Sequence, residues 1–410
     1  MKVFFRIFIR MMSYPGMTRY LEDGSRAKQE NPQTSLNLGT LISRPTVLLA
    51  TAVITEDNLF NNGLFQNVYV MYRMFESMGW LPILIVNVRP EDMKKVPEYM
   101  QDLRLISIQE ISQNPIPIKL YIEVGMSVDD NMRKFLKLCG AKICKVYLGN
   151  ILNIDIETPI FYDMYFAHHV IGDLDEIWVS PHYTQHSEYA RAINHIDIGK
   201  KEAVVVPYVW DPQILTRDGT RNFSWKKGEE VFLIVEPNIS FQKCSLIPLL
   251  ILECWFRKNP DWKGEVVVVN GDRLFMIPFF KESIWNTLDI VKAGRVTMKG
   301  RMDILTILTT YPSAIPICYQ WNNEYNYMVL EYFASGYPVL HNASDWSGYG
   351  YYYKDSDIEG ASLLIDTIRK FHHTNKEIFK SHTRSLLWRH SPYNPLVQKR
   401  WNEILEKLAL

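Results

Sequence analysis

The stretch that decides the fold is "TVLLATAVITEDNLFNNGLFQNVYVMYRMFESMGWLPILIVNV", residues 46–88. It begins with an apolar run rich in β-branched residues, 46–53, and ends with a second apolar run, 81–88. Between them, residues 61–80 combine an Asn- and Gly-rich turn with the apolar spacing of an amphipathic helix. A strand, a loop, a helix and a second strand in this order form the repeating unit of nucleotide-binding folds, whose strands are parallel.

The same alternation continues through the rest of the chain. We expect strands in the first half at 46–53, 81–88, 119–125, 141–149, 175–181 and 202–210. We expect strands in the second half at 230–237, 264–271, 295–300, 314–321 and 337–342. Apolar runs separated by helical stretches are typical of parallel sheets covered by helices on both faces. The pattern therefore predicts an α/β protein with two doubly wound, Rossmann-like domains, and such tandem domains bind ligands in the cleft between them.

The domain boundaries follow from changes in composition. Residues 1–44 are polar with scattered Gly and Pro, which predicts a flexible N-terminal arm. We expect an N-terminal domain at 45–210 and a C-terminal domain at 230–385, joined by the linker 211–229, which lacks apolar runs. A C-terminal helix, 386–410, completes the chain, and packing back on the N-terminal domain is one arrangement open to it.

Composition excludes several classes of protein. The chain has 410 residues, 47% of them hydrophobic and 22% charged, the balance of a globular protein. Its 45 Lys and Arg residues match its 45 Asp and Glu residues, so we expect no nucleic-acid partner. The five cysteines lack CxxC spacing, which indicates buried thiols in a reducing compartment, and we expect a cytoplasmic protein. The interrupted apolar N-terminus predicts no stable membrane span.

Polar residues follow the strands of the second half, where such folds keep their chemistry. After the first strand come Asn238, Ser240 and Lys243, just before a predicted helix whose N-terminus favours phosphate. The alternative is that Ser240 is an N-cap and Lys243 a solvated first-turn residue. After "VTMK", Gly300 permits close backbone approach and Arg301 adds a cation. These residues predict a diphosphate site, and the absence of GxGxxG and P-loop motifs disfavours a dinucleotide cofactor or an ATPase.

The segment "QWNNEYNYMVLEYFASGYPVLHN", residues 320–342, is the most informative one. The amides Asn322 and Asn323 and the acid Glu324 fall in the loop and at the start of an apolar helix that contains Glu331. Two helical turns span about 7.2 residues, so we expect Glu324 and Glu331 on one helix face. A carboxylate at this position accepts both hydroxyls of a ribose, and the amides bind sugar or phosphate. The alternative is a stabilising first-turn acid at Glu324 and a solvated one at Glu331.

These residues resemble the Glu, seven residues, Glu element of retaining GT-B glycosyltransferases, which continues through a helix and Gly-Thr-Pro into a strand. Here Gly336-Tyr337-Pro338 occupies the turn. In that family the second Glu binds the ribose of the sugar nucleotide and the first contacts the donor sugar. The resemblance implies the ribose role for Glu331. Asn323 occupies the first position, with Glu324 one place out of register.

A broader resemblance covers most of the chain from Asn61 onward. The motifs are similar to those of a bacterial and large-DNA-virus family catalogued as a domain of unknown function and classed as glycosyltransferase-like. Similarity to chlorovirus proteins implies a viral origin, synthesis of capsid glycans and, in that case, the host cytoplasm. The motifs that carry the resemblance are "NNGLFQNVY", "IEVG", "DEIWVSP", "VPYVW", "EPNIS", "QWNNEYNY", "GYPVLHN" and "GYYYKD".

In the N-terminal domain, Asn62 and Gly63 occupy the loop that faces donor phosphates and acceptor in GT-B enzymes, although an ordinary turn explains them equally well. His168 follows a family segment, and GT-B enzymes often place a histidine against the donor sugar there, but a structural histidine is the alternative. Glu123, which ends a strand, is the candidate acid near the acceptor.

The sequence thus predicts a GT-B glycosyltransferase that moves a sugar from a UDP- or GDP-linked donor to a glycan or glycoprotein. Because no Asp-x-Asp lies in a suitable loop, we expect no metal site and no cofactor. Retention of configuration is expected by family analogy alone. The alternatives are a nucleotide-sugar epimerase, a DNA-base glucosyltransferase, which the neutral charge disfavours, and an inactive glycan-binding or assembly protein of the same fold.

Overall fold

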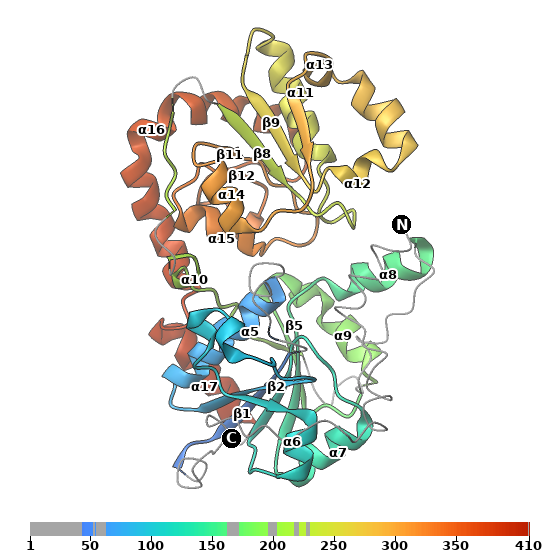
Figure 1. Ribbon diagram of the computed structural model, residues 1–410, viewed down its shortest axis with the longest axis vertical. Coiled ribbons are helices and arrows are strands. Elements are labelled where there is room, and N and C mark those ends of the chain that lie inside the picture. The colour runs from blue at the N-terminus through green and yellow to red at the C-terminus, as the bar shows by residue number, and fades with distance from the viewer. Residues whose placement is uncertain are drawn as a thin grey trace. The chain divides into compact units, whose positions relative to one another are not determined.

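The computed structural model describes residues 43–51, 54, 63–161, 172–195, 203–216, 221–226, 230–408 and 410. The expected N-terminal arm therefore lies almost wholly outside the described residues. The chain divides into two compact units, residues 1–209 with 392–410 (unit 1) and residues 210–391 (unit 2). Figure 1 shows the helices and strands of both.

Unit 1 contains, within its described residues, a parallel sheet of seven strands in the order β3-β2-β1-β4-β5-β6-β7. The strands are β1 (Thr46–Ala50), β2 (Leu81–Val86), β3 (Leu105–Ser107), β4 (Leu120–Glu123), β5 (Lys142–Tyr147), β6 (Glu176–Val179) and β7 (Val204–Val205). Every residue of β1 and β2 is buried, which is why these strands read as unbroken apolar runs. The short strand β3 lies where the sequence predicted none.

The helices of unit 1 begin at recognisable caps. Asp129 accepts from the Met132 N–H before α7, and Ser107 and Glu110 form a reciprocal capping box at α6. Asn394 caps α17, whose first residue is Pro395. The longer helices are α5 (Gly63–Ser77), α6 (Ile108–Gln113), α7 (Asp130–Leu138), α8 (Ile151–Phe161), α9 (Ser187–Ile193) and α17 (Pro395–Lys407).

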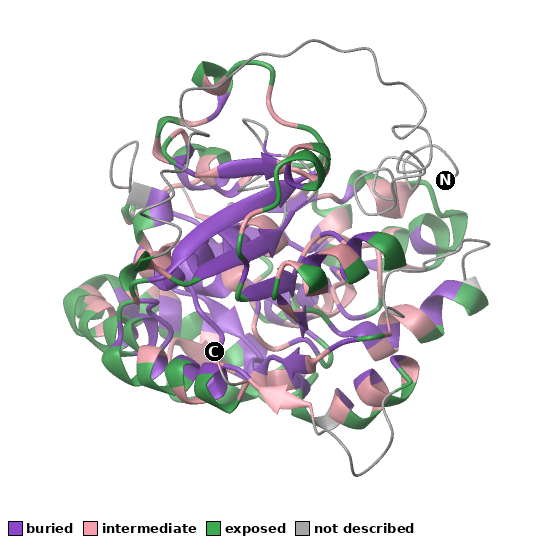
Figure 2. Cartoon of the chain, turned by 90° about the horizontal axis from the view of Figure 1, so that it is seen from below, coloured by how far each residue is buried: buried purple, intermediate pink, exposed green. Residues whose placement is uncertain are grey.

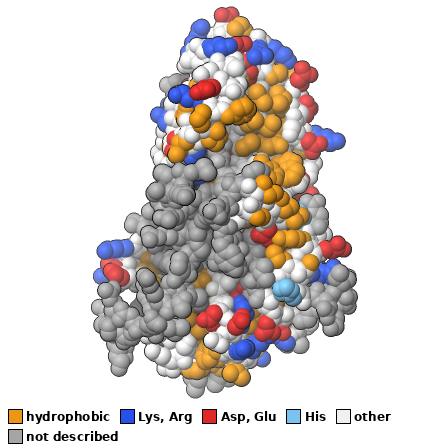
Figure 3. Space-filling model, turned by 90° about the vertical axis from the view of Figure 1, so that its right-hand side faces the viewer, with side chains coloured by type: hydrophobic (Ala, Val, Ile, Leu, Met, Phe, Trp, Pro, Cys, Tyr) orange, Lys and Arg blue, Asp and Glu red, His pale blue; other side chains and the backbone are white. Residues whose placement is uncertain are grey.

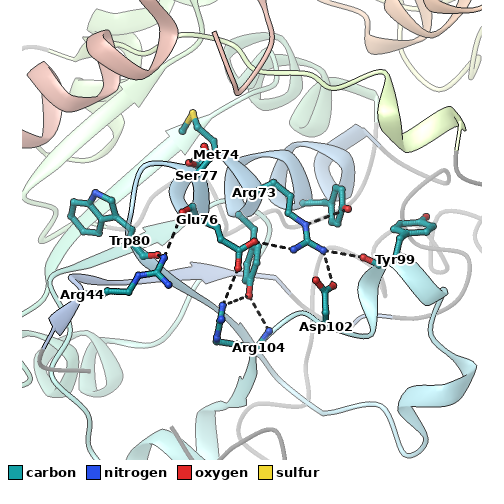
Figure 4. A network of polar contacts seen from close by, with 11 residues as sticks. Arg44, Arg73, Met74, Glu76, Ser77, Trp80, Tyr99, Asp102 and Arg104 are labelled. Atoms are coloured by element: carbon teal, nitrogen blue, oxygen red, sulfur yellow. Dashed lines mark hydrogen bonds and ion pairs between the residues drawn. The ribbon is translucent and has the colours of Figure 1, made fainter. Parts of the chain in front are cut away.

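A network of charged side chains anchors the outer surface of α5 (Figure 4). Arg73 lies 3.0 Å from Glu76 and 2.6 Å from Asp102, and it donates to the Tyr99 carbonyl. Arg104 reaches the other oxygen of Glu76 at 3.2 Å. These bonds join α5 to the segment before β3, so the network stabilises the fold of unit 1.

Unit 2 contains a smaller parallel sheet in the order β10-β9-β8-β11, and the pair β12-β13 continues it through a parallel bridge between Ile317 and Leu340. The strands are β8 (Val231–Val235), β9 (Glu265–Val269), β10 (Val296–Lys299), β11 (Ile315–Pro316), β12 (Leu340–His341) and β13 (Tyr351–Tyr352). The resulting order has the first strand in the middle and a change of direction between β8 and β11, as in nucleotide-binding sheets. The strands expected at 314–321 and 337–342 are shorter in the structure, where they correspond to β11 and β12 of two residues each.

The helices that flank the sheet of unit 2 include one of 32 residues, α16. Asp303 caps α14, Asn326 caps α15 and Asp357 caps α16. The helices are α10 (Gln213–Thr216), α11 (Leu246–Lys258), α12 (Asp272–Phe275), α13 (Asp289–Lys292), α14 (Ile304–Thr310), α15 (Tyr327–Ala334) and α16 (Ile358–Arg389).

Each unit has its own hydrophobic core. Figure 2 shows buried residues concentrated along the strands and exposed ones on the helices. In unit 1 the Trp401 ring of α17 packs edge-on against Phe75 and Trp178, at centroid distances of 5.8 and 5.2 Å. In unit 2 the core includes Trp255, which packs against Phe232 at 5.1 Å. The described helices include none long and apolar enough to cross a membrane.

Candidate functional site

The carboxyl ends of the parallel strands of unit 2 bring several polar loops to one edge of the sheet. The loops follow β8 (236–245), β9 (270–271), β10 (300–303) and β11 (318–326). Ligands of such folds bind at this edge, beside the change of strand direction. The side chains of these loops therefore form the candidate site.

Glu236, the first residue after β8, joins two of these loops. Its carboxylate is fully buried and accepts from the Tyr319 N–H at 3.1 Å and from the Gln320 amide at 3.0 Å. Burial raises the pKa of Glu236 to about 8, against the opposing effects of these hydrogen bonds and of the nearby Lys243 ammonium. The side chain thus fixes the loop after β11 relative to β8.

The amides of the loop after β11 extend the contacts of Glu236. Gln320 accepts from the Asn323 side chain at 2.9 Å. The backbone of Gln320 is paired twice with Asn342, through its N–H at 2.9 Å and its carbonyl at 2.7 Å. Asn323 is buried whereas Asn322 is exposed. This loop is therefore held in one conformation while presenting Asn322 at the surface.

Three asparagine residues with a left-handed backbone conformation lie in the loops after β8, β9 and β11. The φ angles are 52° at Asn238, 59° at Asn270 and 47° at Asn322, a region in which Asn is far more common than most residues. The Asn238 side chain donates to the carbonyls of Glu236 and Asn270 and accepts from Ser245 N–H at 2.8 Å. Asn238 therefore ties the loops after β8 and β9 together.

Three cations follow three neighbouring strands. Lys243 lies in the loop after β8, Arg273 in α12 after β9, and Arg301 in the loop after β10. Burial lowers the pKa of Arg273, and the positive charge of Arg301 lowers it further, so these two guanidinium groups lie close enough to repel. Burial also lowers the pKa of Lys243, while the Glu236 carboxylate opposes that shift. Such an edge attracts anions.

The structure places the helix after β8 within one residue of its predicted start. The sequence predicts a helix over 245–259, and α11 begins at Leu246. Ser240 accepts from the Gln242 N–H at 3.1 Å and forms a bridge with Lys243. Neither the N-cap nor the first-turn alternative for these two residues holds, because both belong to a tight loop that precedes the helix. Gly300 and Arg301 lie after β10, at the same sheet edge, and both are exposed.

The expectation that Glu324 and Glu331 share a helix face is wrong. Helix α15 begins at Tyr327 behind its cap Asn326, so Glu324 lies in the preceding loop. Its carboxylate accepts from the Ser344 hydroxyl at 2.7 Å and from the Asp345 N–H at 3.3 Å. Glu331 lies on α15 and is 1% exposed, which excludes the solvated alternative for this residue.

Of the site residues predicted in unit 1, the structure describes two, and neither lies in an open polar loop like those of unit 2. Asn62 and His168 lie outside the described residues, and Gly63 begins α5, where its carbonyl accepts from Asn67 at 2.8 Å. Glu123 ends β4 and is fully buried, 3.7 Å from Arg133 and beside Lys145. Glu123 is thus part of a closed ion cluster.

Sequence reasoning assigned no role to Glu236, Asn270 or Arg273. Each follows a strand of unit 2, so the rule that selected Lys243 and Arg301 would have found Asn270 and Arg273 if applied to β9. Nothing in the sequence signals that Glu236 is buried among amides rather than solvated. Across the described residues, no three His, Cys, Asp or Glu side chains come together so as to hold a metal ion.

Several solved structures similar to this chain are glycosyltransferases of the GT-B fold, and the chain has this fold. A glycosyltransferase from Rickettsia africae is 14% identical with a TM-score of 0.52, and a trehalose 6-phosphate synthase from Burkholderia multivorans is 9% identical with a TM-score of 0.55. A pneumococcal O-GlcNAc transferase, solved with UDP and GlcNAc, is 7% identical with a TM-score of 0.53. Each comparison covers 89% of this chain and 99% of the other.

The chain belongs to the family described as "Protein of unknown function (DUF2827)", whose model matches residues 48–405. This match, together with the similar solved structures, confirms the expected resemblance to a glycosyltransferase-like family of unknown function. No curated protein matches the chain in sequence.

Proposed function

We propose that this protein is a glycosyltransferase that takes its sugar from a nucleoside-diphosphate sugar, with the donor bound at the strand-end edge of unit 2. The observation that carries the proposal is the row of cations Lys243, Arg273 and Arg301 after three adjacent strands, beside a buried network of amides. The GT-B fold supports it as an analogy.

The cations are suited to a diphosphate. Neither the Lys243 ammonium nor the Arg273 guanidinium makes a hydrogen bond or ion pair with any of the described residues. A diphosphate accepts point-charge contacts from lysine and forked contacts from arginine. The repulsion between Arg273 and Arg301 disappears when an anion lies between them, which favours occupancy.

The other polar residues then take the parts of the donor that remain. We assign the ribose hydroxyls to Glu331 on α15, and the sugar to the loop that carries Asn322, Asn323 and Glu324. Gly300 leaves room for the base or ribose next to the backbone, while Asn238 and Ser240 shape the loop of Lys243. Glu123 receives no role in transfer because its carboxylate is engaged by Arg133 and Lys145 in a closed cluster.

The chemistry asked of these residues is charge stabilisation. As an acceptor hydroxyl of a glycan attacks the anomeric carbon, the bond from that carbon to the diphosphate breaks and negative charge grows on the leaving phosphate. The proton of the hydroxyl passes to the leaving diphosphate, which completes the exchange. Lys243, Arg273 and Arg301 stabilise that charge, so the proposal requires no metal ion and no other cofactor. Retention at the anomeric carbon is proposed by family analogy.

Calorimetric titration with UDP, GDP, ADP and their glucose or mannose conjugates tests the proposal. We expect saturable binding of one nucleotide, unchanged by EDTA, and much weaker binding to Lys243→Met and Glu331→Gln. Lys263→Met is the matched control, since Lys263 is exposed just before the amino end of β9, at the opposite edge of the sheet. Absence of binding by all of these compounds contradicts the proposal.

A further inference from the structure

Two large aromatic side chains are exposed at the edge of unit 2 that carries the candidate site. Phe241, in the loop after β8, is 44% exposed, and Trp321, in the loop after β11, is 42% exposed. Their ring centroids lie 4.8 Å apart with an angle of 58° between the planes. Figure 3 shows that hydrophobic side chains gather on one face of unit 2. A contiguous exposed apolar patch with polar residues at its rim is typical of an interaction site.

The backbone holds the two rings in place. The Trp321 N–H donates to the Gln242 carbonyl at 2.9 Å, which joins the residue after Phe241 to the start of the second loop. Both loops are also fixed below the rings by Glu236, through Gln320. The ring pair is therefore a preformed surface, so little ordering opposes binding.

Polar groups adjoin the rings on both loops. Lys243 follows Phe241 by two residues, and Asn322 follows Trp321 directly, exposed and in the left-handed region. The Trp321 indole N–H makes no hydrogen bond within the part of the chain described. Apolar ring faces beside amide and indole donors match a sugar, which has an apolar C–H face and a rim of hydroxyls.

We propose that Phe241 and Trp321 form an aromatic platform that binds the apolar face of a hexopyranose ring. The tilt of 58° between the rings forms a corner rather than the flat slot that suits a nucleobase. The inference rests on the proposed function for its position beside the donor. The ring bound is either the sugar of the nucleotide conjugate or a sugar of the acceptor, and the two sources share this chemistry.

The test compares wild type with Trp321→Ala, Phe241→Ala and Trp321→Phe. The probes are the nucleoside diphosphate that binds best, its glucose conjugate, and methyl β-glucopyranoside followed by saturation-transfer NMR. Phe371→Ala is the control, because Phe371 is a 46% exposed aromatic on α16 of the same unit. All four changes are at the surface, and thermal unfolding confirms that each variant is folded.

We expect Trp321→Ala to weaken binding of the glucose conjugate or of the methyl glucoside by about threefold to tenfold. The bare nucleoside diphosphate should bind as before, Trp321→Phe should keep most of the affinity, and Phe371→Ala should change nothing. A loss confined to the conjugate identifies the donor sugar, and a loss confined to the methyl glucoside identifies an acceptor sugar.

Other outcomes overturn the inference. If Trp321→Ala and Phe241→Ala bind sugar as wild type does, the two rings do not form a sugar-binding platform. Nucleotide binding would in that case still support the proposed function. An equal loss for the bare nucleotide means that the rings bind the base. If no nucleotide binds but the methyl glucoside binds through Trp321, the platform stands and the proposed function fails. If neither probe binds, both fail.

Discussion

Each unit buries a glutamate at the end of a parallel strand, next to a lysine, but only one of the two pairs is open. In unit 1, Glu123 is surrounded by Lys145 and Arg133, which are each 6% exposed. In unit 2, Glu236 is as fully buried, and its neighbours include the Gln320 amide. Lys243, by contrast, is partly exposed. A closed ion cluster serves the fold, whereas an open lysine beside a fixed carboxylate is available to a ligand.

The largest effect is expected in the closed cluster. Glu123→Gln leaves the buried Lys145 without its carboxylate and deprives Arg133 of a partner, so we expect a loss of about 3–5 kcal/mol in the free energy of unfolding. Chemical denaturation measures it. The double change Glu123→Leu with Lys145→Met should recover much of the stability, because a neutral pair needs no compensation. A loss below about 1 kcal/mol in the single variant would show that the cluster is not structural.

Lys243→Met should give the opposite pattern in unit 2. Because the ammonium makes no hydrogen bond or ion pair with the described residues, the unfolding temperature should change little. Binding of the nucleoside diphosphate should weaken by about tenfold to a hundredfold, as expected for a lost contact to a charged group. Calorimetry and thermal unfolding of the same sample separate the two. If Lys243→Met were strongly destabilised and still bound the nucleotide, Lys243 would serve the fold as Lys145 does, and the two glutamate–lysine pairs would not differ in role.

Glu236 should make unit 2 less stable as the pH rises. Burial raises its pKa to about 8 in the folded chain, against an ordinary value of 4.5, so the folded state holds a proton that the unfolded chain has released. The stability this confers is complete below about pH 4.5 and is lost as the pH rises towards 8. In wild type this loss amounts to about 3 kcal/mol in the free energy of unfolding between pH 5 and 8, and Glu236→Gln should abolish most of it. Parallel profiles would contradict the prediction.

The smallest effect concerns the backbone of the site. Asn270 has a φ of 59°, so Asn270→Ala should cost about 1 kcal/mol more than Asn270→Gly, which adopts this conformation without strain. Urea unfolding of the two variants measures the difference. Equal stabilities would mean that Asn270 is held by its side-chain contacts rather than by its conformation.

The fold was predictable because its signal is repeated. Buried parallel strands such as β1, β2 and β8 are continuous apolar runs, so their alternation with helices predicts the class directly. The short strands β3 and β13 were not predicted, since two or three residues carry no pattern of their own. The start of α15 was placed too early, because Asn326 is one of several polar residues that are equally good caps.

The candidate site was only partly predictable. Lys243 and Arg301 follow strands, and that position alone identified them. The role of Glu236 depends on Gln320, 84 residues further on, and the contact of Phe241 with Trp321 depends on the adjacency of β8 and β11. Contacts of this kind arise from the sheet order and leave no local trace in the sequence.

The most direct test of the open pair as a ligand site is amide hydrogen exchange of the full chain with and without the nucleoside diphosphate that binds best. We predict slower exchange in residues 236–245 and 318–326 of unit 2, and no change around Glu123 and Lys145 in unit 1. Protection confined to unit 1, or no protection in either loop of unit 2 at saturating nucleotide, would contradict the account.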